Sequence, residues 1–364
     1  MSEILDGNAV IYCEGAFDTT DGKTAHGLVR FTNRYRVISV IDSHCAGQDA
    51  GQILDGTDKG IPVVATLDDA IKAGGKNRPS HFVIGLAPAG GQLNSLARQN
   101  VKNALSKGLN VDSGLHDFLS EDTEMVLIAE ENGVSIRDIR KPPPRDNLHF
   151  FSGKIKEVTS FRVAVLGSDS AIGKRTTGWI LTKEFQKAGF KSEMIGTGQT
   201  AWLQGAKFGV IMDSLINDFV SGEIEHAVWS AWDNQKPQVM IIEGQGSLMN
   251  PAYPGGFEIL AAAKPHVIVF QHAPARKYYD GFPEFFIQPL TQQIQVLELL
   301  SEKPVAAVTI NHEALDTTRI PIICSVMEKT LGIPVFDVLL DGASGLVEII
   351  KRYMNRSERS AFTV

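Results

Sequence analysis

The 364-residue chain is predicted to form two doubly wound α/β domains with mostly parallel sheets. Short apolar runs rich in β-branched residues alternate with longer helical segments along the whole sequence. The length exceeds what one average core needs. Three consecutive prolines at positions 142–144 interrupt the alternation, and such a run can neither continue a helix nor lie inside a sheet. We therefore expect a domain over residues 1–145 and a second over residues 146–364.

In the first domain, five apolar runs predict strands. They cover residues 9–13, 37–41, 62–65, 81–86 and 134–139. Helices are expected over residues 94–107 and 121–131. Continuous apolar strands that alternate with helices are typical of a parallel sheet covered on both faces.

The alternation restarts after the prolines. Strands are expected over residues 162–166, 192–195, 239–242, 266–270, 305–310 and 335–339. Helices are expected over residues 174–188, 216–230, 289–301, 320–331 and 344–353. In a doubly wound sheet, ligands bind outside the carboxyl ends of the strands, so these loops are the place to look for a site.

Composition excludes several classes of protein. A net charge of −7 argues against a general nucleic-acid binder, which usually carries a basic patch. No apolar run reaches the roughly 18–20 residues of a membrane span, and the N-terminus lacks the pattern of a signal peptide. The three cysteines are too scattered for a disulfide framework. We expect a cytoplasmic protein that acts on a small molecule without nucleic-acid or membrane partners, as a homo-oligomer.

The strongest motif is Val163-Ala-Val-Leu-Gly-Ser-Asp-Ser-Ala-Ile-Gly-Lys-Arg-Thr-Thr177, a predicted strand followed by a glycine-bounded turn and a helix. It is similar to a phosphate-binding P-loop, because a helix N-terminus and a lysine both favour an anion. The residues expected to bind the phosphate of a cofactor are Gly167, Ser168, Ser170, Gly173, Lys174, Arg175, Thr176 and Thr177.

This loop departs from the usual P-loop pattern in two ways. Five residues, rather than four, separate Gly167 from Gly173, a spacing similar to that of the dethiobiotin-synthetase branch. Arg175 stands where a serine or threonine hydroxyl usually holds Mg²⁺. The alternative interpretation is a glycine-rich turn that only packs.

Two further glycine-rich loops follow predicted strands of the second domain. Glu243 ends one strand, where an acidic residue can accept a proton or hold a metal, and Gln245 and Gly246 follow it. Gln199 and Thr200 lie in the other loop and could donate hydrogen bonds to a carboxylate or a phosphate. Glu243 could instead be a strand-end carboxylate that caps the next segment, and Gly196 and Gly198 could be structural turn glycines.

The first domain carries weaker signals. Gly90 and Gly91 lie between a strand and a helix and could cradle a substrate carboxylate, or could form a plain loop. Asp42 ends a strand where Rossmann-like domains bind a ribose, but no G-x-G-x-x-G follows the first strand. NAD is therefore not expected. The histidines form no ligand pattern such as H-E-x-x-H, so no protein-held metal is expected either.

Five motifs in this order resemble the family catalogued as domain of unknown function 1611. They are the runs starting at Lys23 (Lys-Thr-Ala-His-Gly-Leu), Ala87 (Ala-Pro-Ala-Gly-Gly), Gly167 (the P-loop), Thr197 (Thr-Gly-Gln-Thr) and Ile242 (Ile-Glu-Gly-Gln-Gly-Ser-Leu). The resemblance covers nearly the whole chain. It implies a Rossmann-like N-terminal domain and a P-loop NTPase-like C-terminal domain.

Some members of that family are described as D-glutamate N-acetyltransferases, which make N-acetyl-D-glutamate from acetyl-CoA. The resemblance therefore implies acetyl-CoA as co-substrate. We expect Glu243 or Asp169 to act as the base, and we count Lys174 with them among the catalytic residues. Two alternatives remain open: an ATP- and Mg²⁺-dependent ligase or carboxylase similar to dethiobiotin synthetase, and a nucleotide-binding regulator without catalysis.

Overall fold

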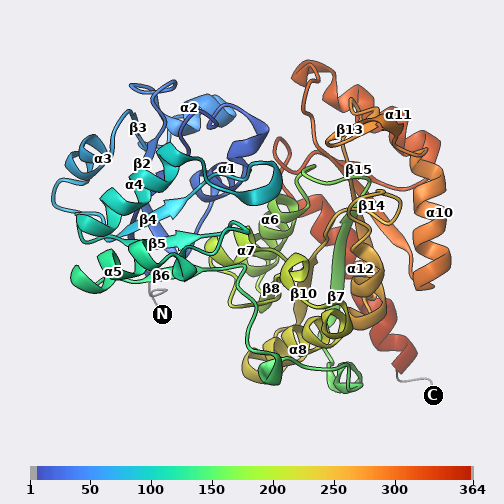
Figure 1. Cartoon of the computed structure of the whole chain (residues 1–364). Coiled ribbons are helices and arrows are strands. Elements are labelled where there is room, and N and C mark those ends of the chain that lie inside the picture. Colours follow the sequence, from blue (N-terminus) through green and yellow to red (C-terminus); the bar gives the residue numbers. More distant parts are fainter. Residues whose placement is uncertain (1–5, 362–364) are drawn as a thin grey trace. The chain divides into compact units, whose positions relative to one another are not determined.

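The computed structural model describes residues 6–361, which divide into two compact units. The first unit contains the chain up to Pro143 together with Gln199–Ala206. The second contains Pro144–Gly198 and the chain from Lys207 onward. Each unit has its own β-sheet with helices packed around it. In Figure 1 the chain of the first sheet is coloured blue to green and that of the second green to red. The predicted fold class, α/β with mostly parallel sheets, is confirmed.

The first unit is built on a six-stranded parallel sheet of order β3-β2-β1-β4-β5-β6. This is the strand order of Rossmann folds. The strands are β1 (Gly7–Tyr12), β2 (Tyr35–Ile41), β3 (Val63–Val64), β4 (His81–Ile84), β5 (Asn110–Ser113) and β6 (Ile136–Asp138). The helices are α1 (Lys23–Arg30), α2 (Ala50–Asp55), α3 (Leu67–Gly74), α4 (Ser95–Ser106) and α5 (Thr123–Glu131), with 3₁₀ turns at Thr20–Gly22, Ala89–Gly91 and Leu119–Glu121.

Strand β5 has no counterpart among the predicted strands, because three of its four residues are polar. Its Asp112 is nevertheless fully buried. The carboxylate accepts a hydrogen bond from the Tyr35 hydroxyl at 2.6 Å and pairs with the Arg137 guanidinium. A buried charge is tolerated when it is paired in this way, so a polar segment can form an interior strand.

A short segment from a distant part of the chain completes the first unit. Helix α7 (Gln199–Leu203) and the residues up to Ala206 follow β8 of the second unit in sequence but pack within the first unit. The Gln204 side-chain amide donates to the carbonyls of Gly27 (2.7 Å) and Phe31 (2.9 Å). The Arg34 guanidinium lies 3.7 Å from the centre of the Trp202 ring. These contacts hold the segment against helix α1 and the residues that follow it.

The second unit has a seven-stranded parallel sheet of order β15-β14-β11-β7-β10-β8-β9. The strands are β7 (Phe161–Gly167), β8 (Ser192–Gly196), β9 (Phe208–Gly209), β10 (Val239–Glu243), β11 (Val267–His272), β14 (Val305–Ile310) and β15 (Val335–Phe336). A separate hairpin pairs β12 (Tyr278–Tyr279) with β13 (Phe282–Phe286). Strand β7 lies between β11 and β10 and is parallel to both. The loops that follow these three strands therefore lie side by side at the carboxyl ends of the strands.

Helices surround this sheet. They are α6 (Lys174–Lys187), α8 (Asn217–Gln235), α9 (Gly256–Glu258), the π-helix η7 (Ile259–Ala263), α10 (Leu290–Ser301), α11 (Ile320–Leu331) and α12 (Ser344–Ala361). Shorter 3₁₀ turns lie at Arg145–Asn147, Lys154–Glu157, Met212–Ser214 and Thr317–Arg319.

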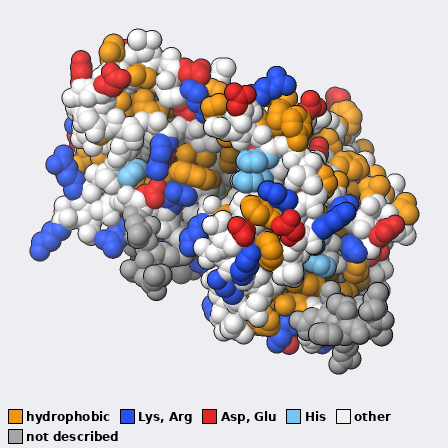
Figure 2. All heavy atoms as spheres, turned by 90° about the horizontal axis from the view of Figure 1, so that it is seen from below, with side chains coloured by type: hydrophobic (Ala, Val, Ile, Leu, Met, Phe, Trp, Pro, Cys, Tyr) orange, Lys and Arg blue, Asp and Glu red, His pale blue; other side chains and the backbone are white. Residues whose placement is uncertain are grey.

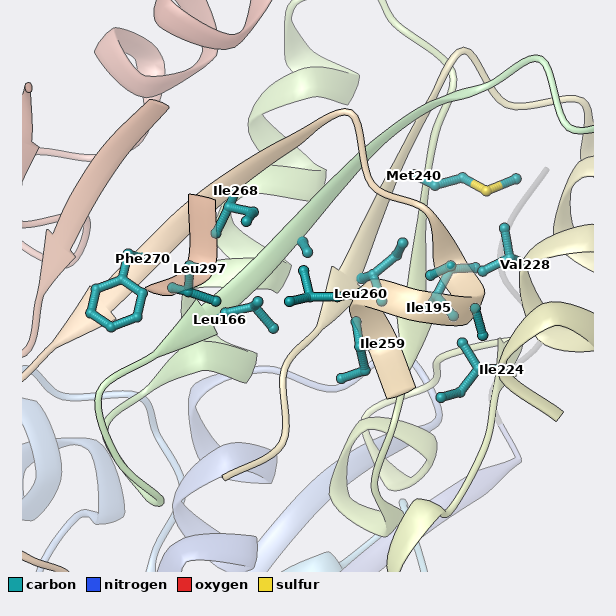
Figure 3. Packing of buried hydrophobic residues seen from close by; sticks show 14 of the residues in the cluster. Leu166, Ile195, Ile224, Val228, Met240, Ile259, Leu260, Ile268, Phe270 and Leu297 are labelled. Atoms are coloured by element: carbon teal, nitrogen blue, oxygen red, sulfur yellow. The ribbon is translucent and has the colours of Figure 1, made fainter. Parts of the chain in front are cut away.

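The main core of the second unit lies between the sheet and the helices α8, η7 and α10. Figure 3 shows side chains of the central strands, such as Leu166, Met240 and Phe270, in one cluster with Val228 of α8 and Leu260 of η7. Full burial of each such side chain contributes roughly 1.5–3 kcal/mol. This packing holds the strands, and therefore the loops at their carboxyl ends, in fixed positions.

Charged side chains of both signs are interspersed over the face shown in Figure 2. None of the helices in the described part of the chain has the length and apolar character that a membrane span requires.

Candidate functional site

The loop between β7 and α6 is built around two positions that require glycine. A Cβ atom on Gly167 would lie 2.7 Å from the carbonyl oxygen of Gln271 on the neighbouring strand. Gly173 has a φ of +98°, in the region that L side chains rarely adopt. Ala171 also has a positive φ, of +53°. For Ala171, which carries a Cβ atom, this conformation costs free energy, and such strained residues gather at functional sites.

Lys174 begins α6 and is 6% exposed. Its ammonium donates a hydrogen bond to the backbone carbonyl of Asp169, inside the same loop. Burial lowers the pKa of Lys174 to about 8, although the carboxylates of Asp169 and Glu243 act in the opposite direction. The first turn of a helix also presents backbone N–H groups without intrahelical partners. Together these groups can hold a phosphate.

Asp169 is fully buried and its carboxylate is occupied by four donors. One oxygen accepts from the backbone N–H of Ser170 (2.7 Å) and the amide of Asn250 (3.0 Å). The other accepts from the Arg276 guanidinium (2.8 Å) and the backbone N–H of Asp280 (2.9 Å). A carboxylate with about four acceptor sites is then saturated. This bonding favours a role in holding three loops together over a role as base.

Glu243 ends β10 beside this loop and is 5% exposed. Its carboxylate accepts the backbone N–H of Thr197 at 2.9 Å, and the Thr197 hydroxyl donates to the Glu243 carbonyl at 3.1 Å. Burial raises the pKa of Glu243, while the charges of Arg175 and Lys174 act to lower it. A buried carboxylate with a raised pKa, close to two cations, is suited to accept a proton.

The loop after Glu243 is held against its surroundings. The Gln245 amide donates to the Thr197 carbonyl at 3.0 Å. Gly246 has a φ of +53°, and a Cβ atom there would collide with the Tyr253 carbonyl. A narrow pocket, lined by Gln245, Gly246, Gln293 and apolar side chains, lies beside Gly167.

Several hydroxyl groups of the predicted loop have interior partners. The Thr177 hydroxyl donates to the side-chain oxygen of Gln271 at 2.6 Å, and the Ser168 hydroxyl is 2.9 Å from the Nδ1 atom of His272. Burial lowers the pKa of His272 to about 4, so this ring is neutral near pH 7. Ser170 is half-buried on the loop, and Thr176 is half-buried in the first turn of α6.

The remaining predicted residues belong to the first unit. Gly90 and Gly91 lie in the 3₁₀ turn after β4 with positive φ angles of +76° and +61°. Gln199 and Thr200 lie in α7, and the Thr200 hydroxyl is 3.1 Å from that of Thr24. The P-loop residues, Glu243, Gln245 and Gly246 are therefore brought together in the second unit, whereas these four form part of the first.

Sequence reasoning missed four residues of the second-unit site. They are Thr197 as the partner of Glu243, Asn250 and Arg276 as partners of Asp169, and Gln271 beside the loop. Gln271 lies near the carboxyl end of β11, which is a usable signal in a parallel sheet. Asn250 and Arg276 lie in irregular loops, where no periodicity marks a position.

Among residues 6–361, no group of three or more His, Cys, Asp or Glu side chains could hold a metal ion.

A Rossmann-type unit and a P-loop unit in one chain define a two-domain P-loop protein. The P-loop domain described as DUF1611_C matches residues 149–347, and the Rossmann-like domain described as DUF1611_N matches residues 43–142. The chain therefore belongs to the domain of unknown function 1611 family, and the resemblance noted in the sequence is confirmed.

Curated relatives and a solved structure resemble most of the chain. A D-glutamate N-acetyltransferase of Tritonibacter scottomollicae is 28% identical over 78% of this chain and 84% of its own. A second, from a Pseudoalteromonas species, is 30% identical over 78% of this chain and 83% of its own. The crystal structure of a DUF1611 family protein from Anabaena variabilis has a TM-score of 0.87 at 28% identity, covering 95% and 99% of the two chains. The names of the relatives indicate an enzyme.

Proposed function

We propose that the protein is a D-glutamate N-acetyltransferase, which transfers the acetyl group of acetyl-CoA to the amino group of D-glutamate. The observation that carries this proposal is the buried Glu243, with its raised pKa, beside an anion-binding loop in a chain whose curated relatives bear that name. Site and relatives point to the same chemistry, since amide formation needs a base and acetyl-CoA carries phosphates.

The loop would hold a phosphate of coenzyme A through the amides at the start of α6 and the charges of Lys174 and Arg175. Arg175 occupies the position from which a hydroxyl usually holds Mg²⁺, and the hydroxyl of Thr177 donates to Gln271. An arginine in place of a metal ligand favours direct contact with the anion over a metal-bridged nucleotide.

In the proposed reaction, Glu243 accepts a proton from the substrate ammonium. The free amine then attacks the thioester carbonyl, a C–N bond forms and the C–S bond breaks. The second proton lost by the amine nitrogen passes to the departing sulfur, so coenzyme A is released as its thiol. Hydrogen-bond donors in the Gln245–Gly246 loop would stabilise the oxyanion that develops. Binding of the substrate carboxylates by Gln199, Thr200, Gly90 and Gly91 stays a prediction.

The test is an assay of free thiol with the purified chain, acetyl-CoA and D-glutamate, beside the same assay with L-glutamate. A parallel reaction contains ATP and Mg²⁺, and phosphate release is followed. Thiol release that depends on D-glutamate supports the proposal. Phosphate release without thiol release would replace it by the ligase or carboxylase alternative, and inactivity in both assays would favour a binding protein.

A further inference from the structure

A second group of cations lies at the amino end of β7, whereas the P-loop follows the carboxyl end of the same strand. Lys156, Arg162 and Lys264 line a cavity of about 570 Å³ whose walls also include the apolar side chains of Phe151 and Ile155. Cavities that hold small ligands measure roughly 300–1,000 Å³. Arg162 is the second residue of β7 and Gly167 the last, so the cavity is about 17 Å along the strand from the P-loop.

Arg162 is a buried charge whose guanidinium has only neutral hydrogen-bond partners within the described part of the chain. It is 7% exposed, and its guanidinium donates to three backbone carbonyls, those of Lys264 (3.0 Å), Val158 (2.8 Å) and Ser160 (3.1 Å). Within residues 6–361, no carboxylate pairs with it, and its Nη2 atom makes no hydrogen bond. Burial lowers its pKa to about 10, which leaves it charged at neutral pH. Unpaired buried charges are costly and call for an explanation.

The groups around the cavity do not supply the missing negative charge. The His266 ring accepts the backbone N–H of Arg162 at 3.0 Å, and its pKa is lowered to about 4 by burial and by Arg162 and Lys303. The buried carboxylate of Glu225 contacts two residues of the cavity wall, but it is already bound by the backbone N–H groups of Ser152 (2.6 Å) and Ile155 (3.1 Å). The three carbonyls hold the guanidinium in place, but they do not neutralise it.

We propose that this cavity binds the phosphate group of a small molecule, at a site separate from the P-loop. The unbound Nη2 group of Arg162 and the two lysine ammonium groups carry three positive charges, which match the two charges and three acceptor oxygens of a phosphate better than a single carboxylate. Phe151 and Ile155 offer an apolar wall to the body of such a ligand. The site explains why an arginine is buried in β7 with only neutral partners.

Hydrogen exchange followed by mass spectrometry tests the proposal locally. Inorganic phosphate is titrated into the full chain, with potassium acetate at matched ionic strength as the reference. We expect phosphate, but not acetate, to slow exchange in segments 150–162 and 260–266. The double variant Lys156→Gln/Lys264→Gln leaves the Arg162 contacts in place, and its half-saturating phosphate concentration for these segments should rise by about tenfold.

The matched control is Lys154→Gln. Lys154 belongs to the same 3₁₀ turn as Lys156, but its ammonium lies 4.3 Å from the centre of the Trp229 ring and does not line the cavity. This variant should bind phosphate as the original chain does, and protection of segment 166–176 at the P-loop should persist in all variants. Equal effects of acetate and phosphate, unchanged affinity in the double variant, or an equal loss in Lys154→Gln would each overturn the proposal.

Discussion

At the scale of single residues, burial tunes the two titratable groups of the candidate site in opposite directions. It raises the pKa of the Glu243 carboxyl and lowers the pKa of the Lys174 ammonium, because a low-dielectric interior disfavours both charged forms. The pKa of each group is thereby shifted toward neutral pH. Glu243 can then exchange a proton, and Lys174 can hold an anion while it is protonated. Asp169, the other candidate base, already has four donors, and for this reason the proposed reaction places the proton transfer on Glu243.

Replacement of the proposed base gives the first prediction. Glu243→Gln keeps the size of the side chain and an oxygen that can accept the Thr197 N–H. It removes the group that takes the proton, so thiol release should fall by about 10²–10⁴-fold while the thermal unfolding midpoint changes little. Near-normal turnover would remove Glu243 from the mechanism.

The matched control is Glu225→Gln, the same chemical change at another buried glutamate. The Glu225 carboxylate accepts hydrogen bonds from the N–H and hydroxyl of Ser152 and from the N–H of Ile155. This variant should lose about 1–3 kcal/mol of stability and keep its turnover. The pair of variants separates loss of a base from loss of a buried charge.

The pH dependence of kcat/KM for acetyl-CoA gives the second prediction. The base works when deprotonated, so activity should rise with pH through the raised pKa of Glu243. Anion binding needs protonated Lys174, so activity should fall as pH passes about 8. In Lys174→Arg the charge persists, so the alkaline limb should move to higher pH and the acid limb should stay. An alkaline limb that does not move would show that another group titrates there.

At the scale of the element, the unit formed by β7, the glycine-bounded turn and α6 could be predicted from the sequence because its signals are local. A run of apolar residues, two glycines and a helix N-terminus are contiguous, and each dictates its own conformation. Gly173, with its φ of +98°, has the left-handed backbone that such a turn requires. Helix α6 itself runs over Lys174–Lys187, close to the expected residues 174–188.

A pair of glycines at the two ends of α6 gives the third prediction. Gly173 and Gly189 have φ angles of +98° and +85°, and a Cβ atom would meet no close contact at either. Alanine at each should therefore cost a similar amount of stability, about 1–2 kcal/mol. Only Gly173→Ala should also raise the KM for acetyl-CoA, by at least about tenfold, because only it changes the phosphate-binding turn. Equal kinetics in the two variants would contradict this role of the loop.

Other elements were not readable, since their stability comes from partners far along the chain. Strand β5 is polar, and its Asp112 is buried only because Arg137 and Tyr35 neutralise and solvate it. Segment 199–206 was expected to serve the P-loop domain that surrounds it in sequence. It packs instead within the first unit, where Gly27 and Phe31 accept its hydrogen bonds.

At the scale of the whole molecule, buried histidines should make stability sensitive to mild acid. Burial lowers the pKa of both His266 and His272 to about 4, below their ordinary value of 6.5. Between pH 6.5 and 4 the unfolded chain therefore binds protons that the folded chain does not. As the pH is lowered through this range, the free energy of unfolding should fall steadily. Below pH 4 the loss caused by these two histidines should level off.

Urea unfolding at pH 7, 6 and 5 measures this fourth prediction. In His266→Phe an aromatic ring can still stack on Phe161, but the titrating group is gone. The loss of unfolding free energy between pH 7 and 5 should be smaller in this variant. Identical slopes in the two proteins would show that His266 does not contribute.

The sequence by itself determined the α/β class, the P-loop turn and the acidic end of β10, because periodicity, glycine spacing and strand-end position are local properties. The net charge of −7 could not indicate the candidate anion site, since its positive charge is carried by a few side chains and one helix end. Only the tertiary structure decided that Asp169 is saturated by Asn250, Arg276 and two backbone amides, and that Arg162 has no carboxylate partner among residues 6–361. The environment of a buried charge depends on residues that folding brings together from distant parts of the chain.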